Sequence, residues 1–313
     1  MKVIYMLALE IKGLKASIGD FKLGPIDLKV NEGEIVGLIG PSGCGKTLLL
    51  KVASGLHEPL TGKVFMGGKE VTNELPHKRN IAFVFQNDAL FPHYDTYKNI
   101  AFPLQLKKEK NIAERVKRKA GELNGLSEYL EKLPKELPAG IKKLTAIGRE
   151  TVRIFDMIFM DEPFERLDKK VRTELRAMIK KLLLKIGRSV LIVLNDCEDA
   201  MAIASKVYIM SDGKIVSSGN PIDIYNNPPD LFSMELFSPF GINKYEDMIF
   251  RPEDVEITEE GLPAVIQHAS PYDSRNALCN VKIGDADCVV FIPLEKARCK
   301  ELHIKITRSF KVG

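Results

Sequence analysis

Short apolar runs alternate with amphipathic stretches over the first two-thirds of the chain, and this alternation predicts the fold class. Five runs are almost continuously apolar, as strands are when helices cover both faces of a mostly parallel sheet. The predicted strands are Glu34–Gly40, Ile81–Gln86, Ile154–Asp161, Ser189–Asp196 and Lys206–Met210. The segments 46–56 and 169–187 carry the apolar spacing of helices. Together these elements predict an α/β domain.

A segment rich in Lys and Glu, from about 98 to 151, interrupts this alternation. Its pattern predicts helices over 110–126 and 127–133 and a further helix that opens at Pro138, where a missing N–H costs nothing. Glu residues are interleaved with the basic residues at helical spacing, which favours solvated helix surfaces over a nucleic-acid-binding patch. We therefore expect a helical insertion between two strands, and no nucleic-acid partner.

The pattern changes again near the C-terminus. The segments 280–294 and 303–312 alternate polar and apolar positions with turn residues between them, which is typical of half-buried strands. We predict a first domain over residues 1–240 and a small all-β domain over residues 241–313, with the boundary inside 237–243.

The bulk composition agrees with a globular protein. The chain has 313 residues, 45% hydrophobic and 28% charged, with a net charge of +4. The apolar run near the N-terminus is broken by Glu10 and Lys12 and lacks a small-residue cleavage site, so it predicts a first strand rather than a signal peptide. No run approaches the ~20 apolar residues of a membrane span. The five cysteines match no zinc spacing and predict free thiols in a reducing cytosol.

The strongest chemical signal is the octapeptide GPSGCGKT. It fits the pattern G-x-x-x-x-G-K-[ST] between an apolar strand and an apolar helix. Glycines allow the backbone to fold around phosphate oxygens, and the following helix adds its positive N-terminal end. The lysine is expected to reach the β- and γ-phosphates, and the threonine hydroxyl to bind Mg²⁺. The predicted phosphate-binding residues are Gly40, Pro41, Ser42, Gly43, Cys44, Gly45, Lys46 and Thr47.

Two carboxylates follow the apolar strand that ends in MDE. A strand end places Asp161 at the carboxyl edge of the sheet, near Thr47, where it can hold Mg²⁺ through the hydration shell. Glu162 comes next and is a candidate to polarise an attacking water. The alternative is that the two residues only cap the next turn, and the phosphate-binding loop argues for the catalytic interpretation.

These motifs resemble the nucleotide-binding subunit of ATP-binding cassette (ABC) transporters, and the resemblance covers nearly the whole chain. The segments 81–104 and 213–232 are similar to the glutamine loop and to the end of the cassette in the sugar-importer group. The segment 250–257 resembles the start of that group's C-terminal β-domain. The resemblance implies a P-loop NTPase cassette with a small OB-like, TOBE-type domain, and it implies ATP and Mg²⁺ as cofactors. It also implies that Gln86 contacts Mg²⁺ and water, and that a permease docks nearby.

Several positions depart from the family pattern. The signature motif LSGGQ falls on 137–141 as LPAGI, so Pro138 supplies neither a hydroxyl nor an N–H to a γ-phosphate. The switch histidine falls on Asn195, which has no titratable proton. The stacking aromatic falls near Ile18, with Phe21 as a substitute, and a charged Glu165 stands where the family has a small serine. These changes predict weakened subunit closure with intact phosphate and Mg²⁺ binding.

The resemblance implies an ATPase subunit of an importer, for sugars or related solutes, in the cytoplasm on the inner face of the cell membrane. Its partners would be permease subunits and a second nucleotide-binding subunit. We expect a heterodimer over a homodimer, because an intact partner signature would complete this chain's site. A weakly active regulatory subunit beside a catalytic paralogue is the alternative. A non-transport cassette of repair or translation is disfavoured, because the chain has no second cassette or long coiled coil.

Overall fold

The computed structural model describes residues 7–311, which form two compact units that divide after Asp223. The division lies inside helix α7 (Pro221–Asn226), earlier than the boundary predicted at 240/241. The reason is that the intervening segment packs within the second unit. The Tyr225 ring lies 4.2 Å from the Arg251 guanidinium, and Ser238 Oγ accepts a hydrogen bond from Arg251 Nε at 2.8 Å.

Two sheets build the first unit. The larger has the order β10-β9-β3-β8-β7-β6, parallel except for β10, which pairs antiparallel with β9. Its strands are β3 (Ile35–Ile39), β6 (Ile81–Val84), β7 (Met157–Asp161), β8 (Ser189–Leu194), β9 (Lys206–Ser211) and β10 (Lys214–Gly219). The smaller is antiparallel and consists of β1 (Leu7–Ile18), β2 (Phe21–Asn31), β4 (Thr61–Met66) and β5 (Lys69–Glu70). The predicted first strand is therefore β1, and residues 1–6 lie outside the described residues.

All five predicted core strands are present, but their ends differ from the predicted ones. Strand β7 begins at Met157 rather than Ile154, because the Ile154 side chain is 73% exposed. Strands β6 and β8 end before Gln86 and Asp196, respectively. The prediction thus overestimated β7 at its N-terminal end, and it overestimated β6 and β8 at the carboxyl edge, where the polar site residues lie.

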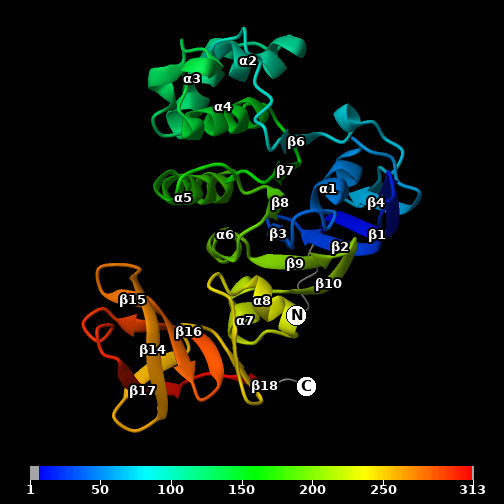
Figure 1. Ribbon diagram of the computed structural model, residues 1–313. Coiled ribbons are helices and arrows are strands. Elements are labelled where there is room, and N and C mark those ends of the chain that lie inside the picture. Colours follow the sequence, from blue (N-terminus) through cyan, green and yellow to red (C-terminus); the bar gives the residue numbers. More distant parts are fainter. Residues whose placement is uncertain (1–6, 312–313) are drawn as a thin grey trace, which may run out of the picture. The chain divides into compact units, whose positions relative to one another are not determined.

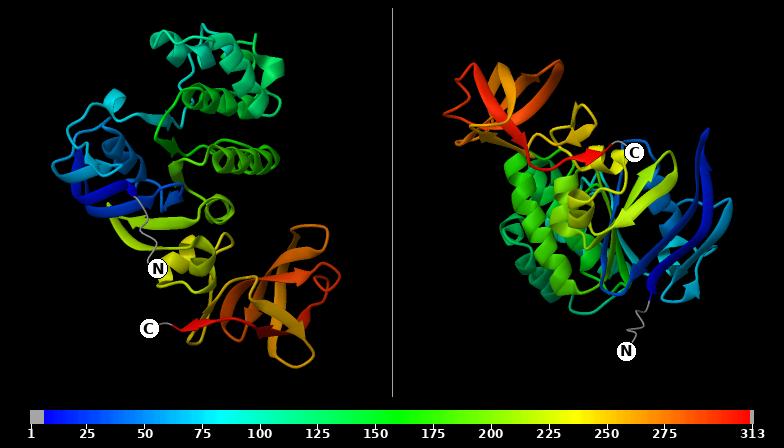
Figure 2. Two further views of the ribbon diagram at one scale, coloured as in Figure 1. Left: turned by 180° about the vertical axis from the view of Figure 1, so that it is seen from behind. Right: turned by 90° about the horizontal axis from the view of Figure 1, so that it is seen from below.

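Helices cover both faces of the larger sheet (Figures 1 and 2). Helix α1 (Lys46–Ser54) contacts β7, β8 and β1 on the side of the antiparallel sheet. Helices α5 (Lys169–Ile186) and α6 (Cys197–Ile203) lie together on the opposite side, where α6 contacts β3 and β8. This arrangement confirms the predicted α/β class.

The helical insertion lies at one end of the first unit, beside β6 (Figure 1). It contains α2 (Thr96–Leu106), α3 (Ile112–Glu122) and α4 (Ala139–Thr151), joined by the 3₁₀ turns Leu126–Tyr129 and Pro134–Glu136. The helix predicted over 127–133 was wrong, since only the first 3₁₀ turn forms there. Pro138 is the N-cap of α4, so the helix does open where the sequence placed it.

The second unit is mainly β. A five-stranded sheet has the order β13-β17-β14-β15-β16, and a three-stranded sheet has the order β11-β12-β18. The strands are β11 (Asn243–Tyr245), β12 (Met248–Phe250), β13 (Val255–Thr258), β14 (Leu262–Pro271), β15 (Asn276–Ile283), β16 (Ala286–Pro293), β17 (Glu301–Ile306) and β18 (Phe310–Lys311). Helix α8 (Leu231–Leu236) precedes them. The predicted C-terminal β-domain is thus present.

Candidate functional site

The phosphate-binding loop joins β3 to α1. Gly43 and Gly45 have φ values of +80° and +103°, which side chains other than glycine rarely adopt. A Cβ on Gly45 would also lie 3.0 Å from the Phe21 ring. Gly45 is the N-cap of α1, so the loop ends at the positive end of a helix. The loop therefore has the backbone freedom and the helix terminus that bind an anion.

Lys46 is buried, and its ammonium group fits a phosphate ligand. Lys46 Nζ donates to the carbonyl oxygens of Gly40 and Pro41, at 2.8 and 2.9 Å. An ammonium group has three donors, so one remains after these two bonds. No carboxylate among residues 7–311 lies within ion-pair distance of it. A buried cation that is bonded only to carbonyl dipoles is stabilised further by an anion, which is the charge that a nucleotide phosphate carries.

Thr47 and Asp161 place two oxygen ligands side by side. Thr47 Oγ1 donates to Asp161 Oδ1 at 2.9 Å, which joins the start of α1 to the end of β7. Burial raises the pKa of the Asp161 carboxyl above its ordinary value, against the Thr47 hydrogen bond. Residues 7–311 contain no cluster of three or more His, Cys, Asp or Glu side chains able to hold a metal. The pair fits Mg²⁺, which takes few protein ligands and fills its octahedral shell with water and phosphate oxygens.

Glu162 occupies a strained position directly after β7. Its φ of 45° lies in the left-handed region, which is uncommon for a residue with a side chain. Strain of this kind persists where the surrounding structure enforces it. Burial raises the pKa of the Glu162 carboxyl, and a hydrogen bond from the Asn195 side chain opposes that rise. A carboxylate with a raised pKa is a better proton acceptor, as a general base requires.

Gln86 and Asn195 both reach Glu162, as their predicted catalytic roles require. Gln86 Nε2 donates to Glu162 Oε2 at 3.0 Å and to Glu165 Oε2 at 2.6 Å. Asn195 follows β8, and its side chain hydrogen-bonds to Glu162. The structure therefore brings the three predicted catalytic residues together at the carboxyl end of the parallel strands, next to Asp161.

A pocket of about 360 Å³ opens over the phosphate-binding loop. Its walls are Ile18, Phe21, Gly43, Gly45, Lys46, Thr47, Leu48, Lys51 and Glu162. Ile18 is 55% exposed, and the Phe21 ring packs beside Gly45. The substitute aromatic named from the sequence therefore lies in the pocket wall together with Ile18.

Two basic residues of α4 bind the glutamine loop, and sequence reasoning missed both. Lys143 Nζ donates to the Gln86 carbonyl oxygen at 2.9 Å and lies 2.5 Å from Asp88 Oδ1 as an ion pair. Arg149 donates to the carbonyl oxygens of Ala89 and Asp88, at 2.6 and 3.1 Å. Lys143 is only 4% exposed. Both residues are buried among the largely apolar and small residues of α4, and a basic residue at a buried position was the signal available in the sequence.

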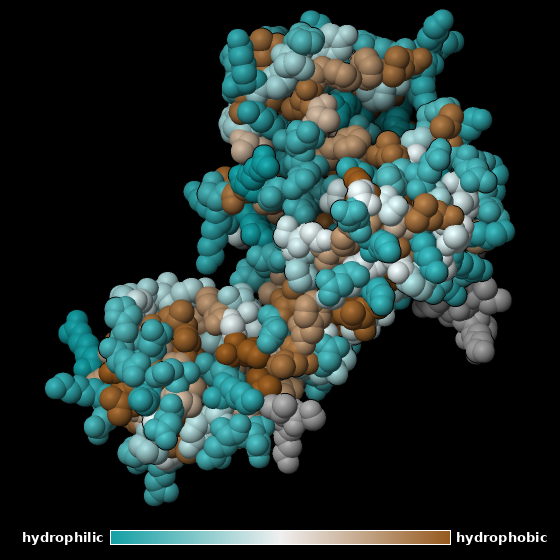
Figure 3. Space-filling model, turned by 45° about the vertical axis from the view of Figure 1, so that its right-hand side comes forward, coloured by the Kyte–Doolittle hydropathy of each residue, from teal (hydrophilic) through white to brown (hydrophobic). Residues whose placement is uncertain are grey.

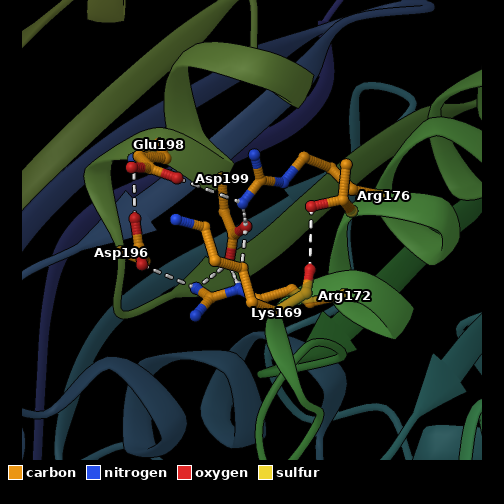
Figure 4. A network of polar contacts seen from close by, with 7 residues as sticks. Lys169, Arg172, Arg176, Asp196, Glu198 and Asp199 are labelled. Carbon is orange, nitrogen blue, oxygen red and sulfur yellow. Dashed lines mark hydrogen bonds and ion pairs between the residues drawn. The ribbon is translucent and has the colours of Figure 1, made fainter. Parts of the chain in front are cut away.

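A buried polar network joins α5 to α6 behind the site (Figure 4). Asp199 accepts hydrogen bonds from Arg172 Nε at 3.1 and 3.2 Å and pairs with Arg176 at 2.6 Å. Arg172 also pairs with Asp196 at 2.9 Å. Asp196 is the N-cap of α6 and directly follows Asn195, so this network fixes the turn that carries Asn195.

Comparison with known proteins identifies the family. The ABC transporter family model matches residues 23–165. The spermidine/putrescine import ATP-binding protein PotA of Thermotoga maritima is 34% identical over 97% of this chain and 80% of its own. The chain belongs to the ABC transporter family. The sulfate/thiosulfate import ATP-binding protein CysA of Synechococcus elongatus is 32% identical over 83% of this chain and 80% of its own length.

Other comparisons extend this result. The trehalose/maltose import ATP-binding protein MalK of Thermococcus litoralis is 40% identical, but over 66% of this chain and 58% of the relative. The crystal structure of the ADP conformation of MJ1267, an ATP-binding cassette, has a TM-score of 0.64 and 25% identity over 74% of this chain. The predicted cassette fold and the ABC-type ATPase class are thereby confirmed.

Proposed function

We propose that this cassette is the ATP-binding and ATP-hydrolysing subunit of a membrane importer. The observation that supports it most directly is the convergence of Lys46, Thr47, Asp161, Glu162 and Gln86 at one sheet edge. The named relatives are import ATP-binding proteins, which adds the direction of transport.

Each residue has a role that its geometry suits. Bound MgATP supplies the phosphoanhydride bond whose cleavage releases energy. Lys46 and the loop N–H groups hold negative charge, while Thr47 and Asp161 offer oxygens to the metal. Glu162 accepts a proton from water once one of its oxygens is available, and Gln86 orients that water. Phe21 and Ile18 provide an apolar wall for the adenine base of the nucleotide.

The permease would dock beside the glutamine loop. A groove of about 330 Å³ lies there, and its lining includes Phe83, Phe85, Pro103, Leu106 and Arg153. Leu106 is exposed, and Figure 3 shows apolar patches among hydrophilic side chains around the helical insertion at the top of the first unit. Phe85 is adjacent to Gln86, so a segment that enters this groove touches the residue next to the site.

The transported solute and the cellular location of the cassette are set by the permease to which it binds rather than by this chain. The relatives import sulfate, polyamines and sugars, so we keep a sugar or related solute as the proposed cargo on the 40% identity to the trehalose/maltose protein. No helix within residues 7–311 has the length and apolarity to cross a bilayer. We propose that the cassette lies in the cytoplasm and binds the inner face of the cell membrane through the permease.

ATP hydrolysis by the purified chain tests this function. We expect Mg²⁺-dependent turnover that Lys46→Ala and Glu162→Gln abolish, with ATP binding retained in Glu162→Gln. Glu174→Gln, on the exposed surface of α5, is the matched control and should leave the rate unchanged. Turnover that persists in Lys46→Ala would refute the assignment of the site.

A weakly active subunit in a heterodimer is the second candidate, and the tip of α4 favours it. Pro138 caps this helix without any side-chain hydrogen bond and has no N–H to offer. Restoring Ser at 138, Gly at 139 and Gln at 141 should increase ATP-driven dimerisation, measured by analytical ultracentrifugation. Unchanged dimerisation would mean that this segment does not limit closure. ATP binding without turnover by the lone chain would favour the regulatory role.

A further inference from the structure

The side-chain amide of Gln86 donates hydrogen bonds to two carboxylates. Its Nε2 lies 3.0 Å from Glu162 Oε2 and 2.6 Å from Glu165 Oε2. A primary amide nitrogen carries two hydrogens, so these two bonds engage both donors. Ionised carboxylates only accept hydrogen bonds, which requires the nitrogen rather than the oxygen of the amide to face them. The pair therefore fixes the orientation of the Gln86 side chain.

The backbone of the same residue is anchored separately. Lys143 Nζ holds the Gln86 carbonyl oxygen, and Arg149 holds the next turn of the loop through Asp88 and Ala89. Asp88 and Ala89 have φ values of 61° and 47°, so the loop adopts a shape that these buried cations stabilise. Because the loop is tied to α4, the Gln86 side chain can change orientation only if its amide leaves the carboxylates.

Glu165 is the carboxylate whose hydrogen bond to the Gln86 amide can break more easily. Its side chain is 37% exposed, and its remaining side-chain partner among residues 7–311 is Arg166, at 3.7 Å. Glu162, by contrast, is half-buried directly after the strand end. Both bonds are charge-assisted, and the bond to Glu165 is the shorter of the two, so Glu165 contributes strongly to the hold on the amide until a partner displaces it. A serine at 165 would be too short to make it.

We propose that Glu165 is a positioning residue that latches the Gln86 amide onto Glu162 in the nucleotide-free protein. The latched amide takes one lone pair of Glu162 Oε2 and stabilises the ionised carboxylate, which makes that oxygen a weaker acceptor of a proton from water. Release of Gln86 from Glu165 allows the amide to leave the Glu162 carboxylate as well. A partner that binds in the groove beside Phe85 and moves the glutamine loop causes this release. The consequence for turnover rests on the proposed function, whereas the latch itself does not.

Selective ¹⁵N labelling of glutamine tests the latch without nucleotide. The chain has three glutamines, Gln86, Gln105 and Gln267, and the last two are exposed. In the wild-type protein the Gln86 side-chain N–H signals, identified by their loss in Gln86→Ala, should lie downfield of the other two. In Glu165→Ser they should move toward the other two, which stay in place. Gln86 signals that are the same in wild type and Glu165→Ser overturn the proposal.

Steady-state ATP hydrolysis by the full chain tests the consequence. Glu165→Ser should raise kcat about tenfold, which corresponds to about 1.4 kcal/mol, with the KM for ATP unchanged. Glu165→Gln, which can still accept through its amide oxygen, should give an intermediate rate. Glu174→Ser on exposed α5 should match wild type.

The Glu165→Ser substitution in a Gln86→Ala background distinguishes the latch from a direct effect of the Glu165 charge on Glu162. If Glu165 acts through Gln86, Glu165→Ser changes nothing in that background. An equal rise there means that Glu165 acts directly on Glu162, and it overturns the latch. Absence of Lys46-dependent turnover in every variant, with the NMR shift present, refutes the proposed function and leaves the latch standing. Lys46-dependent turnover without the NMR shift refutes the latch alone.

Discussion

Replacing Asp199 by Asn should destabilise the first unit, because this residue is the centre of the network between α5 and α6 (Figure 4). Asp199 is 2% exposed and accepts charge-assisted contacts from Arg172 and Arg176. Asparagine keeps the shape and one acceptor oxygen but removes the negative charge from between two guanidinium groups. The two cations then repel each other without a shared counter-ion.

The size of the effect follows from what each arginine retains. Breaking a buried ion pair by removing one partner costs about 3–5 kcal/mol. Arg172 keeps Asp196 at 2.9 Å, and the Arg172 and Arg176 side chains are 27% and 16% exposed, so water compensates part of the loss. We therefore expect about 2–3 kcal/mol, which is a fall of about 5–10 °C in Tm for a unit of this size.

Thermal unfolding followed by circular dichroism checks this value, with Glu198→Gln as the control. Glu198 lies in the same network, but its contact with Arg176 is 3.8 Å long and its side chain is 46% exposed. Its loss should cost no more than about 0.5 kcal/mol. A fall below 2 °C in Asp199→Asn, or an equal fall in both variants, would refute the claim that burial of the shared carboxylate sets the energy.

Three further predictions concern other parts of the molecule. Arg79 is buried and donates to four carbonyl oxygens, two of them at the C-terminal end of α1, so Arg79→Met should cost about 3–5 kcal/mol in urea unfolding, whereas Lys78→Met should be neutral. Burial raises the pKa of the Asp254 carboxyl, so the contribution of this group to stability is present at low pH and is lost as pH rises through the raised pKa. The stability of Asp254→Asn relative to wild type, measured by urea unfolding, should therefore increase from pH 4 to pH 7. Cys299 is the exposed thiol and the other four are buried, so a thiol reagent should label one site rapidly, and Cys299→Ser should abolish that phase.

Sequence patterns located the core of the fold because burial imposes them. Strands covered on both faces are continuously apolar, and β3, β7 and β8 are buried at every position. The pattern failed where burial does not dictate conformation. Residues 127–133 have a helical composition, yet only the 3₁₀ turn Leu126–Tyr129 forms there, and tertiary packing rather than local propensity decides this segment.

The candidate site was predictable as far as the chemistry of single residues goes. The glycines, Lys46, Thr47 and Asp161 follow from motif spacing, because backbone geometry and metal ligation demand those residue types. The position of Glu165 was not predictable in the same way. The sequence gives its charge at a position usually small in the family, but only the fold places that carboxylate 2.6 Å from the amide of Gln86, 79 residues earlier.

The altered tip of α4 does not imply that the helix has lost its part in coupling. Pro138 and Ile141 replace groups at the end that would face a second subunit, but the helix still binds the glutamine loop through Lys143 and Arg149. Any motion of α4 therefore pulls on the backbone of Gln86, whether or not its tip grips a phosphate. It follows that substitutions at the tip of α4 should change dimer closure. Lys143→Met should instead change how the Gln86 backbone moves with α4, while leaving closure intact.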